Sequence, residues 1–380
     1  MANKKKLLIK VSTIFKPRFG NINYVSGIGR STYMLLRSIA QQNNLPYKIA
    51  LYGAGISSIH GRAKDLPFDY TCFPLPMKLG TDLTRLEPFY LNHIQKADLL
   101  HIPHNYDYAL SKDMHFTVTM HDTCEYDTAV ERHHKDRMDV WKLSAKYSKK
   151  IVTCSESSKN DIIDRFGVPE HKIVVIPWGI SFDLFQRVEK KKLNMVLNKF
   201  SINEPYFFVV SCFSERKNVA KLLEAYGKFS ENRSNPNIVL IWNEPPSHIL
   251  SRYSREIENG KIKFIKYVSD DELVSLYSGA LATLFPSRYE GFGFPVLESF
   301  ACGTPVMTCR NSSLPEVGGD LAVYVDEDSI DEMVQAMEMF ANSQFDIESF
   351  QGKLREHLSK FSWTKAANSY IDFFDEVMNS

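Results

Sequence analysis

The feature that most constrains this fold is a series of short apolar segments alternating with helical patterns. In the first half the helical pattern covers residues 30–41, and its apolar side chains recur on one stripe. The segments that suit buried strands are 7–14, 49–52, 99–102, 116–120, 151–154 and 173–176. Strands that are apolar on both faces and separated by helices are typical of a parallel sheet covered by helices. We therefore predict an α/β domain here.

The same rhythm restarts after a polar stretch at 186–203, whose charged run at 189–192 is typical of a solvated linker or helix face. The second series consists of strands at 206–211, 238–242, 262–267 and 281–285, with helices at 218–229 and 271–278. A chain of 380 residues suits two domains of about 150 residues or more. We predict two Rossmann-like α/β domains, residues 1–182 and 183–364. The expected ligand site is the cleft between them.

Composition excludes several classes of protein. The chain is 44% hydrophobic and 24% charged, as in ordinary folded proteins, and its net charge of +1 argues against a nucleic-acid-binding protein. Lys10 interrupts the apolar N-terminal run and no small-residue cleavage site follows, so this run predicts a first strand rather than a signal peptide. The six cysteines form no CxxC pair, which fits a cytoplasmic protein.

The most informative stretch is 286–306. It predicts a glycine-punctuated loop after strand 281–285, then a helix that begins at Pro295 and ends before Gly303. Glu290 lies on this loop, and Glu298 is expected in the first helical turn. Glycines beside a loop carboxylate let backbone amides approach a ligand. The two carboxylates alone also fit a surface loop residue and a complement to the helix dipole.

Three further features are weaker alone. Arg216 and Lys217 precede a helix, where cations and exposed N–H groups can bind a diphosphate, although such a pair is often simply solvated. The Gly27–Gly29 loop lacks a third glycine at 32 and lies about a dozen residues beyond the first strand, so we reject dinucleotide binding. His121 ends strand 116–120, where a lone histidine often has only a structural role.

Together these segments resemble a known family. Glu290 and Glu298, in a P-S-x-x-E-G-F-G-x-P-x-x-E frame, are similar to the signature of retaining GT-B glycosyltransferases of the family 4 type. The resemblance covers nearly the whole chain and is weakest in 45–95 and 230–260. Other segments that match in order and spacing are 26–30, 118–122, 153–158, 172–177 and 311–317. The resemblance implies a GT-B fold in which the final helix, residues 365–380, crosses back onto the N-terminal domain.

The resemblance also implies a metal-independent, retaining hexosyltransferase with no cofactor and a nucleotide-diphosphate sugar as donor. Its implied donor-binding residues are Arg216 and Lys217 for the diphosphate, Glu290 with Gly291, Phe292, Gly293 and Phe294 for the sugar, and Glu298 for the ribose. His121 would bond a sugar hydroxyl, and the catalytic residues would be His121, Glu290 and Lys217. The loop Gly27, Ile28 and Gly29 would line the cleft near the donor phosphate and the acceptor.

Donor and acceptor are less constrained. Ser211 and Cys212 stand where the family commonly has a glycine and an arginine, so Arg216 becomes the second cation. The resulting R-K-N motif resembles a subgroup with many mannosyltransferases, which favours GDP-mannose. A UDP-sugar donor, a nucleotide-sugar epimerase and a non-catalytic glycan-binding protein stay open. The expected acceptor is a glycan or a lipid-linked glycan. With Lys4–Lys6, a lipid-linked acceptor leaves a peripheral membrane contact open as well.

Overall fold

The structure is a computed structural model that describes residues 4–11, 27–54, 66–73, 89–104, 114–124, 134–210, 214–231 and 236–380. The chain divides into two compact units. The first unit is Met1–Gly179 with Trp363–Ser380, and the second unit is Ile180–Ser362. These limits lie slightly earlier in the chain than the limits of 182 and 364 expected from the sequence. The reason is local, because Ile180 and Ser362 pair as a parallel β-bridge and so belong together.

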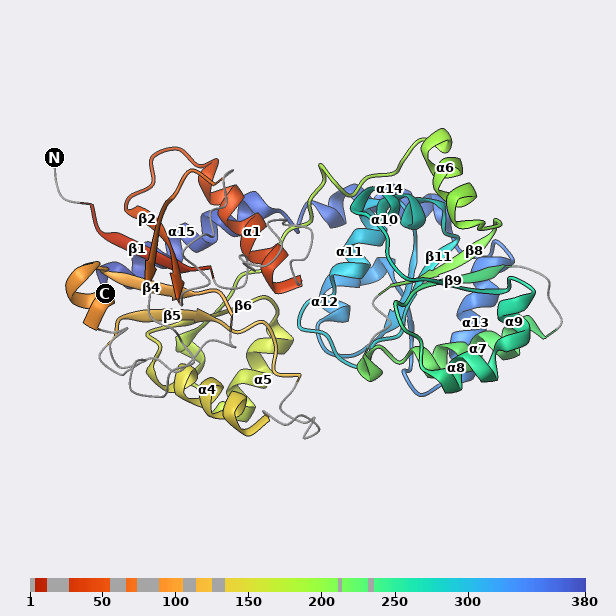
Figure 1. The fold of residues 1–380 in the computed structure, drawn as a ribbon, viewed down its shortest axis with the longest axis horizontal. Helices are drawn as coiled ribbons and strands as arrows, with labels where there is room; N and C mark the ends of the chain where they lie inside the picture. Colours follow the sequence, from red (N-terminus) through yellow and green to blue (C-terminus); the bar gives the residue numbers. More distant parts are fainter. Residues whose placement is uncertain are drawn as a thin grey trace. The chain divides into compact units, whose positions relative to one another are not determined.

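The first unit contains one parallel sheet within the described residues, in the order β3-β2-β1-β4-β5-β6-β7. Its strands are β1 (Lys6–Lys10), β2 (Lys48–Ala54), β3 (Asp69–Phe73), β4 (Leu99–Ile102), β5 (Phe116–Thr119), β6 (Ile151–Thr153) and β7 (Ile173–Val175). Its helices include α1 (Gly27–Ala40), α4 (His134–Tyr147), α5 (Glu156–Phe166) and α15 (Trp363–Asn379). Helices α1 and α15 lie side by side on one face, and α4 and α5 cover the other (Figure 1).

Helix α15 is tied to this sheet by aromatic and polar contacts. Tyr370 and Phe374 are buried on its inner face. The Tyr370 hydroxyl lies 3.0 Å from Oγ1 of Thr119 on β5, and the Phe374 ring lies 4.9 Å from the ring of His101 on β4. The C-terminal segment therefore packs as part of the first unit.

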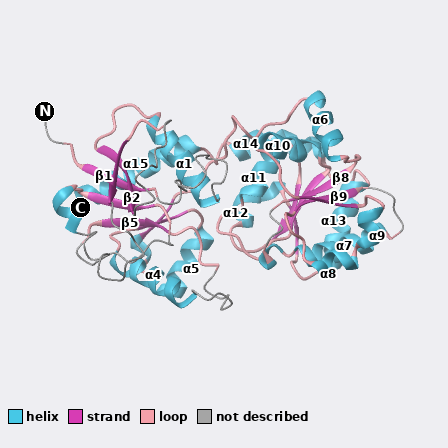
Figure 2. Ribbon diagram, viewed as in Figure 1, coloured by secondary structure: helices cyan, strands magenta, loops and turns pink. Residues whose placement is uncertain are grey.

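The second unit has a parallel sheet in the order β10-β9-β8-β11-β12-β13. Its strands are β8 (Tyr206–Val209), β9 (Asn237–Ile241), β10 (Ile262–Ile265), β11 (Ala282–Phe285), β12 (Val306–Cys309) and β13 (Val323–Val325). Its helices are α6 (Lys190–Phe200), α7 (Val219–Ser230), α8 (Ser247–Arg252), α9 (Ser254–Glu258), α10 (Asp270–Gly279), α11 (Phe294–Ala301), α12 (Leu314–Gly318), α13 (Ile330–Ala341) and α14 (Ile347–Leu358). Helices lie on both faces of the strands (Figure 2).

These two sheets confirm the predicted pair of parallel-sheet α/β domains. The polar stretch 186–203 contains helix α6, whose lysines 190–192 are exposed while Val196 and Leu197 are buried, so its charges lie on a solvated face. Strand β3 was not predicted, because its sequence DYTCF mixes polar and apolar residues and its position is at a sheet edge. Among the described residues, no helix is both long and apolar enough to cross a membrane.

Candidate functional site

The predicted donor residues of the second unit gather at the carboxyl ends of its central strands. From β8 the chain moves outward through β9 to β10, and then returns to place β11 on the other side of β8. Parallel α/β sheets bind ligands at such a reversal of strand order, beyond the carboxyl ends of the strands. Arg216 and Lys217 follow β8 in a short 3₁₀ turn, and Glu290 follows β11. The sheet topology therefore brings the two predicted groups together.

Glu290 forms ion pairs with both predicted cations. Its Oε1 lies 2.6 Å from Nζ of Lys217, and its Oε2 lies 2.9 Å from Nη1 of Arg216. The Lys217 and Glu290 side chains are only 8% and 10% exposed, whereas Arg216 is 29% exposed. Ser287 donates a further hydrogen bond of 2.5 Å to Oε1. Two cations thus converge on one buried carboxylate, which leaves the cluster with one net positive charge.

The electrostatics of Glu290 reflect this arrangement. Burial by itself raises the pKa of the carboxyl, but attraction to Lys217 and Arg216 and the hydrogen bonds from Lys217 and Ser287 outweigh burial. The net effect is a pKa below the ordinary value for glutamate. The Nζ of Lys217 also lies 4.8 Å from the centre of the Phe285 ring, a cation–π contact at the end of β11.

The loop after β12 holds the backbone of Glu290 in place. Ser312 accepts a 2.9 Å hydrogen bond from the Glu290 N–H, and the Ser313 hydroxyl lies 2.8 Å from the carbonyl oxygens of Glu290 and Phe292. Asn311 donates to the carbonyl of Ser287 at 3.3 Å. The post-motif loop therefore fixes the main chain at Glu290 and Phe292, while the Glu290 side chain is held separately by Lys217, Arg216 and Ser287.

The glycine loop itself needs glycine at one position. Gly293 has a φ of +109° and caps helix α11, and a Cβ there would lie 3.2 Å from Leu314. Phe292 is buried against Phe294 and Phe361, with ring centres 5.2 and 6.0 Å apart. The packing of Phe292 and the left-handed backbone of Gly293 together fix the conformation of residues 291–294 at the start of α11.

Glu298 lies deeper in helix α11 than predicted. Because α11 begins at Phe294, one residue before the expected Pro295, Glu298 falls in the second turn, and the prediction of a first-turn position is wrong. Glu298 is 8% exposed, and its carboxylate accepts a 2.9 Å hydrogen bond from the hydroxyl of Tyr277 on α10. A buried carboxylate held by a phenol is oriented by that contact rather than by the helix dipole alone.

His121 lies in the first unit, just beyond β5, and is 5% exposed. Its Nε2 lies 2.7 Å from the carbonyl oxygen of Pro103, so Nε2 carries the proton, because a carbonyl can only accept. The ring packs against Trp178 at 4.8 Å. Burial lowers the pKa of His121 to about 4, which keeps the ring neutral near pH 7. Within the described part of the chain its buried Nδ1 has no hydrogen-bond partner, so it presents an acceptor.

The other predicted positions are placed only in part. Gly27, Ile28 and Gly29 form the first turn of helix α1, while the residues before them lie outside the described part of the chain. Ser211 and Cys212 also lie outside it. Within the described ranges, no group of three or more His, Cys, Asp or Glu side chains has the arrangement of a metal site.

Comparison with known proteins places this chain in a family. The sequence model described as Glycosyltransferase Family 4 matches residues 25–184, and the model described as Glycosyl transferases group 1 matches residues 193–362. Together, the two models match most of both units. The chain belongs to the family 4 type of GT-B glycosyltransferases.

Among curated relatives of this glycosyltransferase, the O-antigen chain mannosyltransferase B of Escherichia coli is 32% identical over 253 residues. That alignment covers 64% of this chain and 63% of the relative, which is less than two thirds of the relative's length. Sucrose-phosphate synthase from Thermosynechococcus elongatus has a TM-score of 0.72 at 15% identity, covering 99% of this chain and 100% of that one. Anabaena Alr3699/HepE with UDP-glucose has a TM-score of 0.70 at 13% identity, covering 98% and 99%. These structures share the fold of the glycosyltransferase.

Some residues of the candidate site were not predicted from the sequence. Ser287, Ser312 and Ser313 stand inside the quoted motifs, so their sequence positions pointed to the site, but nothing in the sequence shows that their hydroxyls bond to Glu290. Tyr277 gave no signal, because an aromatic residue on a predicted helix usually indicates packing. Its role depends on α10 lying beside α11, where its hydroxyl reaches Glu298.

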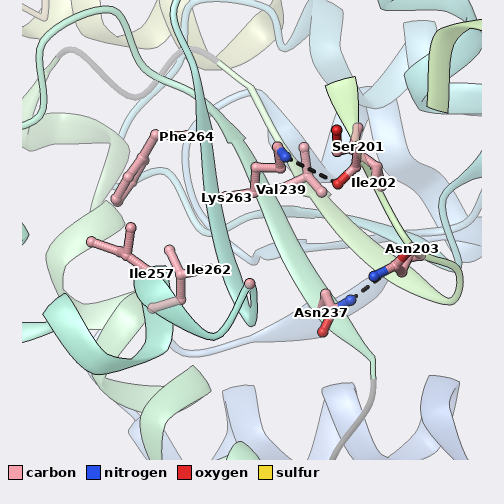
Figure 3. Close-up of a pocket in the computed structure, with 10 residues that line it drawn as sticks. Ser201, Ile202, Asn203, Asn237, Val239, Ile257, Ile262, Lys263 and Phe264 are labelled. Carbon is pink, nitrogen blue, oxygen red and sulfur yellow. Dashed lines mark hydrogen bonds between the residues drawn. The ribbon is translucent and has the colours of Figure 1, made fainter. Parts of the chain in front are cut away.

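Two cavities of the glycosyltransferase lie apart from the Glu290 cluster. One, of about 290 Å³, opens near the amino ends of β9 and β10 (Figure 3). Figure 3 shows Ile257, Ile262 and Phe264 on one side, while Lys263 bonds to the carbonyl of Ser201 on the other. The second, of about 340 Å³, is lined by Arg310, Pro315, Gly319, Asp320, Ala322 and Tyr324. The first cavity lies at the amino ends of the strands, whereas α/β proteins bind ligands beyond the carboxyl ends.

Proposed function

We propose that this glycosyltransferase moves a hexose from a nucleotide-diphosphate sugar to a glycan or lipid-linked acceptor in glycan biosynthesis. The observation that carries the proposal is the pair of cations, Arg216 and Lys217, held at the reversal of strand order in the second unit. A diphosphate leaving group gains negative charge during transfer, and preorganised cations stabilise that charge. Membership of the family and the solved complex of the Anabaena protein with UDP-glucose support a nucleotide-sugar donor.

The other site residues are proposed to bind the ribose, the sugar and the acceptor. Glu298, oriented by Tyr277, accepts hydrogen bonds from the ribose hydroxyls. Glu290 and the amides of residues 291–294 bind the sugar hydroxyls and place the anomeric carbon toward the acceptor. His121 belongs to the first unit, and its unprotonated Nδ1 suits a sugar hydroxyl as hydrogen-bond donor. Residues 27–29 of α1 are proposed to lie near the donor phosphate and the acceptor.

GDP-mannose is the proposed donor. The R-K-N motif at 216–218 favours it, and so does the mannosyltransferase relative from Escherichia coli. A UDP-sugar is the second candidate, supported by the UDP-glucose complex of the Anabaena protein. The experiment is to incubate the protein separately with GDP-mannose, UDP-glucose, UDP-galactose and UDP-N-acetylglucosamine, and to measure binding and slow donor hydrolysis. We expect one of these donors to be bound and hydrolysed. A protein that binds none of the four would contradict the proposal.

The proposed reaction is metal-independent and retains the anomeric configuration. In this proposal the charge that a metal ion would neutralise is met by Arg216 and Lys217. Activity should therefore persist after extensive treatment with EDTA, and nuclear magnetic resonance should find the product's anomeric configuration unchanged from the donor's. Activity that vanishes with EDTA and returns with Mn²⁺ or Mg²⁺, or a product of inverted configuration, would reject that part of the proposal.

A peripheral membrane contact is proposed for the lysine-rich start of the chain. Three basic residues near an anionic surface contribute about 1 kcal/mol each. The amines of Lys4 and Lys5 already bond to the carbonyls of Leu45 and Met378, so we expect weak binding. Cosedimentation with phosphatidylserine-containing vesicles should be detectable at low salt and lost at 0.5 M salt. Its absence at low salt would reject the contact.

A further inference from the structure

The carboxylate of Glu290 forms ion pairs with the two cations that a diphosphate would bind. Each of its oxygens faces one cation, Oε1 toward Lys217 and Oε2 toward Arg216. The amine of Lys217 has three donors, and its hydrogen bond to Glu290 is the one that the structure gives it among the described residues. A diphosphate arriving at this amine meets a buried carboxylate of the same sign. Like charges at close range inside a protein repel strongly, so both anions cannot share the site at full strength.

The side chain of Glu290 can leave without disturbing the loop that carries it. Ser312 and Ser313 hold its backbone N–H and carbonyl, so these bonds to the main chain can stay in place when the side chain rotates. The Ser287 hydroxyl, which donates to Oε1, also lies 3.2 Å from the carbonyl oxygen of Tyr289. That carbonyl offers the hydroxyl another acceptor, so no buried donor is stranded when the carboxylate turns away.

We propose that Glu290 is an internal counter-ion of Lys217 and Arg216, and that a diphosphate displaces it from both cations. This inference rests on the proposed function, since it assumes that the two cations bind the diphosphate of the donor. Displacement releases the carboxylate toward the sugar at the moment when the diphosphate is seated. In this proposal Glu290 weakens diphosphate binding while it pairs with the cations, and binds the sugar after it is displaced. Binding of the diphosphate and binding of the sugar are therefore coupled through one side chain.

The inference predicts an unusual gain of affinity from a mutation in the site. Glu290→Gln keeps the size and a hydrogen-bonding group but removes the competing charge. We expect inorganic pyrophosphate, GDP and UDP to bind this variant about tenfold more tightly than wild type, equivalent to about 1.4 kcal/mol. Transfer activity should fall, because a neutral carboxamide replaces the carboxylate that is proposed to bind the sugar. Calorimetry at pH 7 in the presence of EDTA measures the affinities.

Two further variants make the test specific. Asp328→Asn removes one negative charge near the same sheet edge, where Asp328 pairs with Arg288 and Lys221 and is 64% exposed. It should change pyrophosphate affinity by less than about twofold, because exposed charges are screened. Ser287→Ala removes the neutral donor that holds Oε1 and should raise pyrophosphate affinity modestly, which provides a second readout if Glu290→Gln does not fold.

The outcomes separate this inference from the proposed function. If wild type binds pyrophosphate and Glu290→Gln binds it equally or more weakly, the counter-ion role is wrong and the donor site stands. An equal gain in Asp328→Asn would mean a general charge effect and would also overturn the inference. If Lys217→Ala binds pyrophosphate as tightly as wild type, the donor site itself is misplaced. Tighter binding in Glu290→Gln alone among the two charge variants supports the inference.

Discussion

Replacing Lys217 by alanine should both destabilise the protein and remove diphosphate binding. The Lys217 and Glu290 side chains are 8% and 10% exposed, and their charged atoms are 2.6 Å apart. Removing one partner of a buried ion pair costs about 3–5 kcal/mol, because the other charge stays buried. Arg216 remains 2.9 Å from the second oxygen and is 29% exposed. Because Arg216 still neutralises part of the charge, we expect a smaller loss than that range, about 2–3 kcal/mol of unfolding free energy.

The pH dependence of this loss has a defined sign. The folded-state pKa of Glu290 is below its ordinary value, so its contribution to stability is complete above the unfolded pKa of about 4.3. That contribution is lost as the pH falls through the folded pKa. Without Lys217, burial is less well opposed and the pKa of Glu290 rises. The stability difference between wild type and Lys217→Ala should therefore be largest near pH 7 and should shrink below about pH 4.

Chemical denaturation followed by circular dichroism at pH 7 and at pH 4 measures these differences. Lys221→Ala is the matched control, since its amine pairs with Asp328 at the surface, where the two side chains are 27% and 64% exposed. An exposed pair contributes about 0–1 kcal/mol, so this control should unfold nearly as wild type does. Equal stability of Lys217→Ala and wild type at pH 7, together with unchanged affinity for GDP and UDP, would show that Lys217 has neither role.

Three further predictions concern the rest of the molecule. Glu298→Gln should weaken nucleoside-diphosphate binding by about 1.5–3 kcal/mol, as for a hydrogen bond to a charged group, and an unchanged dissociation constant in calorimetry would contradict its ribose role. Unfolding free energy should fall as the pH drops below about 6.5, because the unfolded chain then binds protons. In the folded protein His101 and His121 stay neutral over this range, because burial lowers their pKa values to about 3 and about 4. An unfolding free energy that stays constant between pH 7 and pH 5 would contradict this prediction. Tyr370→Phe should lose about 1 kcal/mol with its bond to Thr119, and an unchanged thermal midpoint would show that the bond does not stabilise the α15 contact.

Most of the fold could be predicted from the sequence, because buried parallel strands consist of short runs of apolar residues. The expected segment 99–102 coincides with β4, and 116–120 overlaps all of β5. Strand β3 could not be predicted, because an edge strand packs less and DYTCF carries polar residues. The start of α11 was misjudged because the left-handed backbone of Gly293 sets it, and φ angles are not visible in a sequence.

The site could be predicted as a set of residues but not as an arrangement. Glycines, carboxylates and cations are recognisable along the chain, and the topology of parallel strands places them at one sheet edge. The ion pair between Lys217 and Glu290 joins residues 73 positions apart, and only the folded sheet shows that the carboxylate faces the cations. The contact of Tyr277 with Glu298 likewise depends on the packing of two helices. Charge matching of this kind follows from tertiary structure.

The most direct test of the account is a crystal structure of the protein with the nucleoside diphosphate that it binds, GDP or UDP. We expect diphosphate oxygens within hydrogen-bond distance of Nζ of Lys217, with the Glu290 carboxylate turned away from that amine. A diphosphate bound elsewhere, such as the cavity beside Asn237 and Lys263, with the Lys217–Glu290 pair still at 2.6 Å, would contradict it.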